Sequence, residues 1–569
     1  MPRNPAKGEA LGIVLFGLAG CTCWVWQAAS AIIDGLAAER VGLTLSERFI
    51  FAERRNALAF WVGSAVVALG VLLHLPMVWM ARDMGFMLAG MPMDAAMLWG
   101  MALIVGGISL AGYGLLPKQA VEAAAHEAIA PPENAPLTRA HWILMVVLAV
   151  ALIIDIMKPA SLGFVTPGMR VEYGVDAATV ALLPFSALVG TVLGSFVWGA
   201  LADIYGRRAA ILLSSVMYIG TSICGAMPSL WWNLVMCLLM GAAAGGMLPV
   251  SYALLAEIMP TRHRGWSLVL VGGVGAVGGY LASSILSALL QPYFGWRIMW
   301  FLNFPTGVIL IALSPLIPES ARFLQQMGRI AEARIILARF GAVITTAPGG
   351  DDAYDGKDHT PLPPNVPGYV GTTLALTLAA LAWGFVNFGV LLWLPGSLVA
   401  EGRSMGLAST IIAKSTLFAA PAVIAVAYLY SAWSTKWSLV TMIAITTLGL
   451  LALLLRATDF LPFLSNPILP FALLIVGSTG VISILLPYTA ENYPIKVRGR
   501  ATGWVAGCSK LGGLIAQGLS VLALVPALDI AAMSIAMPAA LSLLLIAILG
   551  RETRNRDLRE LETVSTRSG

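Results

Sequence analysis

The chain has 569 residues, of which 59% are apolar and 11% are charged, with a formal net charge of +5 and a mean hydropathy of +0.85. Soluble domains carry about 25% charged residues, so the composition excludes a soluble globular protein. Five cysteines in so long a chain exclude a disulfide framework, and basic residues at this level are expected in the loops of a membrane protein rather than on a nucleic-acid surface.

The first part of the chain, residues 1–136, predicts an N-terminal extension with about three membrane spans. Its apolar runs lie at 10–33, 57–81 and 94–117, and a helix needs about 20 apolar residues to cross a bilayer. The first run has a second interpretation, a signal-peptide-like or interfacial segment, because Arg3 and Lys7 precede it.

A methionine ladder separates the last two of these runs. Methionine pairs four residues apart share a face if the segment is helical, and thioethers bind Cu(I). Methionine is also an ordinary filler of membrane cores, so a copper site is an alternative hypothesis; apart from it we expect no metal and no cofactor. The candidate ligands of this alternative are Met87, Met91, Met93 and Met97.

Twelve further apolar runs follow and predict an all-α, polytopic membrane protein. Each run is bounded by charges or turn residues and is long enough to span a bilayer. The runs lie at 141–166, 177–199, 209–227, 231–257, 267–290, 298–316, 371–396, 406–430, 437–456, 467–488, 501–524 and 530–549.

The first of the twelve spans carries two charges, Asp155 and Lys158, one helical turn apart. Charges inside a membrane are costly and indicate function by default. We expect Asp155 to be the group that carries a proton and Lys158 to contribute to substrate binding. The alternative is an ion pair in which the two groups neutralise each other.

Two lysines fall inside later spans, Lys414 in the eighth and Lys510 in the eleventh. An excess of buried lysines favours an anionic substrate, whose carboxylate would pair with a cation that is otherwise costly to bury. Snorkelling of the lysine chains to an interface is the alternative. Uncharged candidates for the same cavity, or else interface anchors, are Tyr252, Trp383, Asn387, Trp393 and Tyr488.

An internal repeat divides the twelve spans into two sets of six. The pattern Ala-Glu-x-x-Pro-x-x-x-Arg-Gly at 256–265 recurs at 490–499, and the same offset of 234 residues maps Gly278-Gly279 onto Gly512-Gly513. Pro318-Glu319-Ser320 after the sixth span is echoed by Arg551-Glu552-Thr553 after the twelfth. This duplication predicts two parallel repeats with a substrate site between them.

Composition and the repeat together suggest a division into five parts. Arginines and lysines concentrate in the 2–3, 4–5 and 10–11 loops, the centre and the tail, which places both ends of the twelve-span unit in the cytoplasm by the positive-inside rule. Residues 331–340 of the central part predict an amphipathic helix. The parts are the extension (1–136), a first six-helix repeat (137–317), a cytoplasmic linker (318–369), a second six-helix repeat (370–550) and a cytoplasmic tail (551–569).

The loop after the second span reads Gly199-Ala-Leu-Ala-Asp203-Ile-Tyr-Gly206-Arg207-Arg208. We expect Asp203 to bond a neighbouring helix end or an arginine, while Gly199 and Gly206 allow close helix contact and a turn. Such a charge cluster acts as a latch on the cytoplasmic side.

These motifs resemble the major facilitator superfamily, in particular its sugar-porter and metabolite:proton symporter branches, over about 137–560. Gly163-Phe-Val-Thr-Pro167 keeps the ending of the symporter first helix, whereas Lys158 and Cys237 stand where that pattern has a second acid and an arginine. The resemblance implies a cytoplasmic gate, which besides the loop residues above includes Glu257, Arg264, Glu319, Arg322, Glu491 and Arg498.

The sequence therefore predicts a secondary transporter of a small organic anion such as a carboxylate, working by alternating access with protons as the coupling ion. We expect a monomer in a cell membrane, the inner membrane of a bacterium, with a solute, protons and lipid as its partners and no nucleic acid. A copper or metal-complex transporter and a non-transporting membrane sensor are the alternatives. No sequence motif indicates an enzyme.

Overall fold

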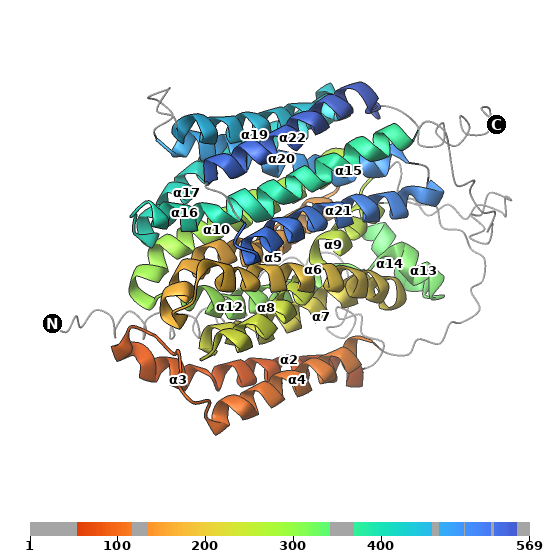
Figure 1. Ribbon diagram of the computed structural model, residues 1–569. Coiled ribbons are helices and arrows are strands. Elements are labelled where there is room, and N and C mark those ends of the chain that lie inside the picture. Colours follow the sequence, from red (N-terminus) through yellow and green to blue (C-terminus); the bar gives the residue numbers. More distant parts are fainter. Residues whose placement is uncertain are drawn as a thin grey trace.

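The computed structural model describes residues 54–116, 135–341, 369–457, 466–493, 495–524 and 528–554, without the side chains of Ile495, Lys496 and Arg498. Within these ranges the chain forms helices and connections and contains no strand (Figure 1). The predicted span at 10–33 lies outside the described residues. Thirteen helices of the described part are long and apolar enough to cross a membrane.

The first repeat contains six membrane-crossing units, and each coincides with a predicted span. Several units are interrupted by short 3-10 turns or by breaks. The elements are α5 (Arg139–Tyr173), α6 (Ala177–Tyr205), α7 (Arg207–Gly220) with η2 (Thr221–Ala226), α8 (Leu230–Ala244) with α9 (Met247–Ile258), α10 (Thr261–Phe294), and α11 (Ile298–Phe301) with α12 (Asn303–Ala312) and η3 (Ser314–Leu316).

The linker begins with two short helices, α13 (Ala321–Gln326) and α14 (Ile330–Arg339). The second confirms the amphipathic helix predicted at 331–340, and its buried residues are Ala333, Ile336 and Leu337. Both helices lie at one end of the bundle, beside the cytoplasmic ends predicted for the membrane helices (Figure 1).

The second repeat again contains six units at the predicted places. Two of them are interrupted by π-helical turns, η4 and η5, a form that occurs often at functional sites. The elements are α15 (Val370–Phe385) with η4 (Val386–Val390) and α16 (Leu391–Ala400), α17 (Met405–Ala419) with α18 (Ala422–Tyr428) and η5 (Leu429–Trp433), α19 (Thr435–Ala457), α20 (Ile468–Asn492), α21 (Ile495–Val521) and α22 (Leu528–Leu549).

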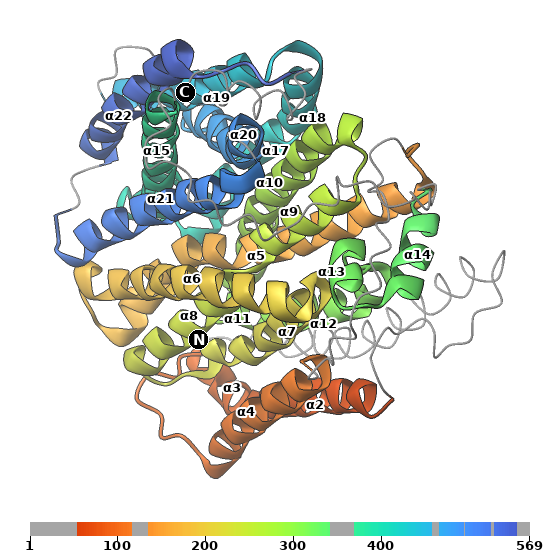
Figure 2. The same cartoon turned by 90° about the vertical axis from the view of Figure 1, so that its right-hand side faces the viewer.

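The two repeats lie side by side, with the second above the first in Figure 2. Their interface is formed by α5 against α16, α10 against α17 and α20, and α6 against α21. Helix α21 is not among the thirteen candidates by composition, because Lys510, Gln517 and several glycines reduce its apolar content. The helices that carry the candidate charges, α5 and α21, therefore both belong to the interface.

The described part of the extension is a helical hairpin of α2 (Arg54–Leu72), α3 (Leu75–Met80), η1 (Ala81–Met84) and α4 (Ala95–Leu115). Its two long helices touch through glycines: a Cβ atom at Gly107 would lie 2.7 Å from the carbonyl oxygen of Gly63. The hairpin lies against α7 of the first repeat, where Ile104 and Val67 contact Gly220 (Figure 2).

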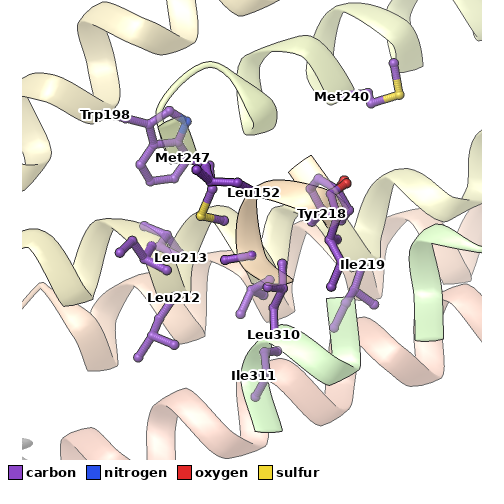
Figure 3. Close-up of a cluster of buried hydrophobic side chains, with 14 of the residues drawn as sticks. Leu152, Trp198, Leu212, Leu213, Tyr218, Ile219, Met240, Met247, Leu310 and Ile311 are labelled. Carbon is purple, nitrogen blue, oxygen red and sulfur yellow. The ribbon is translucent and has the colours of Figure 1, made fainter. Parts of the chain in front are cut away.

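Buried apolar side chains hold the first repeat together behind this hairpin. Figure 3 shows part of the cluster, with Leu152 from α5, Trp198 from α6, Tyr218 from α7 and Leu310 from α12. Each of these side chains is at most 3% exposed. Protein therefore surrounds helix α7 on all sides.

Candidate functional site

Helix α5 places Asp155 and Lys158 deep inside the bundle. The helix runs for 35 residues and continues through Pro159 and Pro167. Asp155 is 6% exposed and Lys158 is 1% exposed. The prediction that both charges lie within the membrane-crossing part of the first span agrees with these positions.

Lys158 is directed towards α7 rather than towards Asp155. Its ammonium lies over the Tyr218 ring and donates hydrogen bonds to the Thr221 hydroxyl at 3.0 Å and to the Tyr218 carbonyl at 3.4 Å. These acceptors lie where α7 passes into the 3-10 turn η2. Asp155 and Lys158 have no nitrogen–oxygen contact within 4.0 Å, so the ion pair considered from the sequence is not formed in this conformation.

Asp155 instead lies within the electrostatic reach of Lys510, a residue of the other repeat. One carboxylate oxygen of Asp155 is buried and has no hydrogen-bond partner in the described part of the chain. Lys510 is partly buried on α21, with its ammonium 5.1 Å from the centre of the Phe388 ring. The structure thus brings together two of the predicted charges, one from each repeat, without a direct ion pair between them.

Asn387 lies in the π-helical turn η4, next in the chain to Phe388, which contacts Lys510. Asn387 is half-buried, and no hydrogen bond to its amide is recorded among the described residues. The neighbouring Trp383 donates from its indole nitrogen to the Ser478 carbonyl at 2.8 Å and meets the Phe388 ring edge-on. The polar group of Trp383 is therefore already used within the repeat.

The other uncharged candidates have different surroundings. Tyr252 is half-buried and packs against the apolar clusters of both repeats, as expected for a residue near a central site. Tyr488 is fully buried, and its hydroxyl donates to the Arg551 carbonyl at 2.6 Å. The interpretation of Tyr488 as a cavity residue is therefore not supported, because its hydroxyl fixes the C-terminal segment. Trp393 is half-buried against Gly389.

Lys414 lies on an exposed face of α17. The same face exposes Leu407, Leu417 and Phe418, which are 51%, 61% and 71% exposed. Large apolar side chains on the outside of a membrane helix face lipid. This position supports the snorkelling alternative for Lys414 over a role in the central site.

The repeats are pressed together at the end of the bundle opposite the linker. Ser287 and Ser409 share a hydrogen bond of 2.7 Å, and the Tyr280 hydroxyl donates to the Leu391 carbonyl at 2.6 Å. A Cβ atom at Gly163 would lie 2.6 Å from the Leu392 carbonyl oxygen. Towards the other end, a small, mostly apolar pocket between the repeats is lined by residues of α10, α17, α18 and α20, with Thr479 and Ser483 as its hydroxyl groups.

The loop between α6 and α7 forms the ion cluster that the sequence suggests. Arg207 pairs with Asp203 and, at 3.3 Å, with Glu257 at the end of α9. The Glu319 carboxylate accepts from the backbone N–H groups of Arg207 at 2.8 Å and Arg208 at 3.2 Å, at the first turn of α7. These contacts join elements of the first repeat to one another.

The two glycines of this loop differ in role. Gly206 has a φ of +105°, and a Cβ atom there would lie 2.4 Å from the Glu319 carboxylate, so the turn requires glycine. A Cβ atom at Gly199 would meet nothing within 4 Å. The expectation of close helix contact at Gly199 is therefore wrong, because no described residue packs against α6 at that position.

The second repeat has a corresponding cluster built with hydroxyl groups. Glu552 accepts from the Thr435 backbone N–H at 3.0 Å and from the hydroxyls of Ser434 and Thr435 at the start of α19. Glu491 accepts from Tyr430 and Thr553, each at 2.7 Å. The echo between the two post-repeat segments in the sequence therefore corresponds to equivalent contacts.

The remaining gate candidates are partly described. Arg264 donates to the Met259 carbonyl at 3.4 Å, and Arg322 lies in the first turn of α13. The side chain of Arg498 lies outside the described residues.

A buried polar cluster at the opposite end was not predicted. Glu172 and Arg297 pair at 2.6 Å with side chains 5% and 2% exposed, and Arg297 also donates to the Gly225 and Met227 carbonyls. Glu172 further accepts from the backbone N–H groups of Leu88 and Ala89, which fixes the hairpin to the first repeat. The residues come from four distant segments, so no local sequence pattern marks them.

The methionine ladder does not form the faces required for copper. Residues 85–94, between η1 and α4, are not helical, so Met87, Met91 and Met93 are not aligned on a helix. Met87 is 54% exposed whereas Met97 is fully buried in α4. The geometric premise of the copper hypothesis is therefore wrong for this segment.

Comparison with known proteins agrees with this architecture. Residues 142–517 match the Major Facilitator Superfamily. The chain is 26% identical to a niacin transporter of Acinetobacter baylyi, over 68% of this chain and 87% of that protein. It is 26% identical to a gallate transporter of Pseudomonas putida (67% and 85%) and 25% identical to a 4-hydroxybenzoate transporter of Acinetobacter baylyi (67% and 84%).

The fold is also that of solved structures of the xylose transporter XylE from E. coli. One, in a partially occluded inward-open conformation, is 14% identical and has a TM-score of 0.61, covering 74% of this chain and all of that one. The family match extends from α5 into α21. The chain therefore belongs to the Major Facilitator Superfamily and is a multi-pass membrane transporter, not an enzyme.

Proposed function

We propose that this transporter moves an aromatic monocarboxylate and couples its movement to protons by symport. The observation that carries the proposal is the pair Asp155 and Lys510, which lie in different repeats within electrostatic reach of each other without a direct ion pair. A carboxylate that enters between them gains a cation at Lys510. A buried carboxylate without a directly paired cation, such as Asp155, costs the least free energy when it takes up a proton as the substrate binds.

The aromatic part of the substrate has matching surroundings. Trp383 of the second repeat supplies ring surface, and the amide of Asn387 supplies a hydrogen-bonding group. Ligand sites combine apolar walls with few polar groups in this way. The relatives named for niacin, gallate and 4-hydroxybenzoate all have aromatic acids as their named substrates.

Lys158 has a different part in this proposal. Its ammonium is already held by α7, so we assign it to fixing α5 against α7 and to the positive potential around Asp155. Its position also keeps a cation within reach of Asp155 after the substrate has left. The proton, in turn, is assigned to Asp155.

We further propose that the linker and the C-terminal segment lie on the cytoplasmic side of the cell membrane. The arginine-rich loop at 206–208, the helices α13 and α14, and the Glu552 cluster all belong to the same end of the bundle (Figure 1). The positive-inside rule assigns such an end to the cytoplasm.

The test is uptake by purified protein in liposomes. Labelled nicotinate or 4-hydroxybenzoate is expected to accumulate only when a proton gradient is imposed. Asp155→Asn is expected to keep exchange of labelled for unlabelled substrate and to lose gradient-driven accumulation. Lys510→Gln is expected to weaken substrate binding by about tenfold or more, because an ionic hydrogen bond is lost.

Two controls give the opposite expectation. Lys436→Gln changes the same residue type at the start of α19, and Asp83→Asn changes an exposed acid of the hairpin; both are expected to transport normally. Equilibration without a proton gradient would leave a uniporter and reject symport. Failure of every aromatic acid to compete for uptake would reject the substrate class.

A further inference from the structure

One face of α21 contacts a single residue of the π-helical turn η4, Phe388, and we call this set of contacts the clasp. Gly513 and Gln517 follow Lys510 by three and seven residues, so all three positions lie on one side of the helix. Lys510 places its ammonium 5.1 Å from the centre of the Phe388 ring, and Gln517 donates from its amide to the Phe388 carbonyl. A Cβ atom at Gly513 would lie 2.6 Å from the Phe388 ring, so glycine is needed for the approach.

The amide of Gln517 has a clear physical reason to be there. In a π-helical turn the backbone bonds run to the fifth residue along, which displaces carbonyls from the α-helical ladder. A carbonyl at membrane depth needs a partner, because unsatisfied backbone groups are costly there. Gln517 is 1% exposed and itself needs an acceptor for its amide. The hydrogen bond satisfies both groups and fixes the bulged turn to α21.

The first repeat contains the simpler version of this contact. Ser283 lies 234 residues before Gln517, the offset of the sequence repeat, and its hydroxyl donates to the Met157 carbonyl of α5 at 2.7 Å. The same offset places Gly279 opposite Gly513, and a Cβ atom at Gly279 would lie 2.9 Å from the Met157 backbone nitrogen. In that repeat the residue at the place of Lys510 is Ala276, which carries no charge. The second repeat has thus added an aromatic ring and a lysine to a shared contact.

We propose that Phe388 and Gln517 are positioning residues that hold the Lys510 ammonium towards Asp155 of the first repeat. This inference rests on the proposed transport of a carboxylate, and it names the side chains that set the geometry of its binding cation. A carboxylate that binds the Lys510 ammonium also changes the interaction of that ammonium with the Phe388 ring. Because Phe388 belongs to the π-helical turn between α15 and α16, the bound carboxylate acts on that turn as well. The turn therefore connects binding of the anion to α16, the helix that packs against α5 where the two repeats are pressed together.

The clasp is tested first without any substrate. Melting temperatures of purified protein give the non-additivity between Asp155→Asn and Lys510→Gln, which measures the interaction between the two charges. The non-additivity is expected in the unchanged background and is expected to disappear when Gln517→Leu is also present. Gln291→Leu is the matched control: its amide donates to the Phe164 carbonyl at 3.1 Å, far along α5 from the charge pair. If the non-additivity survives Gln517→Leu, the proposal is overturned.

The second measurement is the kinetics of uptake of labelled nicotinate or 4-hydroxybenzoate into liposomes. Gln517→Leu and Phe388→Leu are expected to raise the apparent KM by about tenfold with a much smaller change in kcat, while Phe388→Tyr, which keeps the ring face, restores the affinity. Combined with Lys510→Gln, neither change is expected to weaken binding further. Additive losses would assign the two residues a general structural role and overturn the proposal.

The two measurements separate failure of the clasp from failure of the proposed function. Loss of charge coupling in Gln517→Leu supports the clasp even if no aromatic acid is transported, and in that case the proposed substrate is rejected alone. Normal transport of an aromatic acid by Gln517→Leu with unchanged KM rejects the clasp and leaves the proposed function intact.

Discussion

Glu319 and Glu552 cap the first turns of two helices that hold equivalent places in the two repeats. Glu319 follows the sixth membrane unit and accepts from Arg207 and Arg208 at the start of α7. Glu552 follows the twelfth and accepts from Thr435 at the start of α19. A carboxylate at a helix N-terminus satisfies N–H groups that have no partner within the helix and interacts favourably with the helix dipole.

The two caps are expected to differ in how much they stabilise the protein. Glu319→Ala leaves buried N–H groups of α7 without an acceptor and is expected to cost about 2 kcal/mol or more. Glu552→Ala is expected to cost less, because the Ser434 hydroxyl still accepts from the Trp437 N–H at 2.9 Å. Thermal unfolding of the purified variants measures both losses, with Asp83→Ala as the control, because the Asp83 side chain is 88% exposed. Equal losses for the two caps would contradict this assignment.

The same two carboxylates predict opposite responses to pH. Burial raises the pKa of Glu319 above its usual value, since its hydrogen bonds only partly offset the loss of water. Burial alone would also raise the pKa of Glu552, but hydrogen bonds from Ser434 and Thr435 outweigh it and hold the pKa below its usual value. Compared with the unfolded chain, the folded state therefore binds a proton more readily at Glu319 and less readily at Glu552.

The sign of each effect follows from proton binding. The stabilisation from Glu552 is present above the usual glutamate pKa of 4.5 and is lost as the pH falls below it. The melting-temperature advantage of the unchanged protein over Glu552→Gln should therefore shrink in acid. For Glu319→Gln the unchanged protein should gain in relative stability as the pH falls through the raised pKa towards 4.5. Parallel pH curves for the two comparisons would refute the assigned shifts.

The ion pair between Glu172 and Arg297 is expected to be essential for stability. Arg297→Ala leaves a buried carboxylate without its cation, which costs about 3–5 kcal/mol, and it also leaves the Gly225 and Met227 carbonyls without a donor. The exposed pair of Arg456 and Glu401 at 2.8 Å is the control, and Arg456→Ala is expected to change stability by about 1 kcal/mol or less. Thermal unfolding distinguishes the two, and similar small losses would show that the buried pair is dispensable.

Adjacent glycines of α4 provide a test of the hairpin. Gly107→Ala places a methyl group 2.7 Å from the Gly63 carbonyl oxygen and is expected to separate α2 from α4, with a lower melting temperature. Gly106→Ala meets nothing within 4 Å and is expected to be neutral or slightly stabilising, because alanine is the better helix former. A stable Gly107→Ala protein would mean that the two helices have room to move apart.

The sequence was sufficient to predict the twelve spans of the two repeats and their duplication, and it singled out Glu319 and Glu552 without predicting that they cap helices. Long apolar runs at this mean hydropathy leave few alternatives to membrane-spanning helices. The 234-residue offset aligns Glu319 and Glu552 only approximately, yet the contacts of the two residues are equivalent. These features depend on local composition and on repetition, both of which are visible in one chain.

The directions of individual side chains were not predictable. Helical spacing places Asp155 and Lys158 on one face, but Lys158 follows the acceptors of α7 and η2, whose 3-10 geometry has no clear sequence signal. The π-helical turn around Phe388 and its bond with Gln517 depend on contact between α15 and α21, far apart in the chain. Tertiary contacts of this kind decide which of several chemically suitable residues reaches the site.

The hairpin also breaks the symmetry of the protein towards its lipid surroundings. In the most apolar stretch of Arg207–Ala226, 94% of residues are buried, compared with 56% for Thr435–Arg456, the equivalent helix of the second repeat. Bilayer thickness and lipid head groups are therefore expected to act directly on the outer helix of the second repeat, whereas in the described part of the chain α2 and α4 cover α7 of the first repeat. A change of membrane composition is therefore expected to act on the protein mainly through the second repeat.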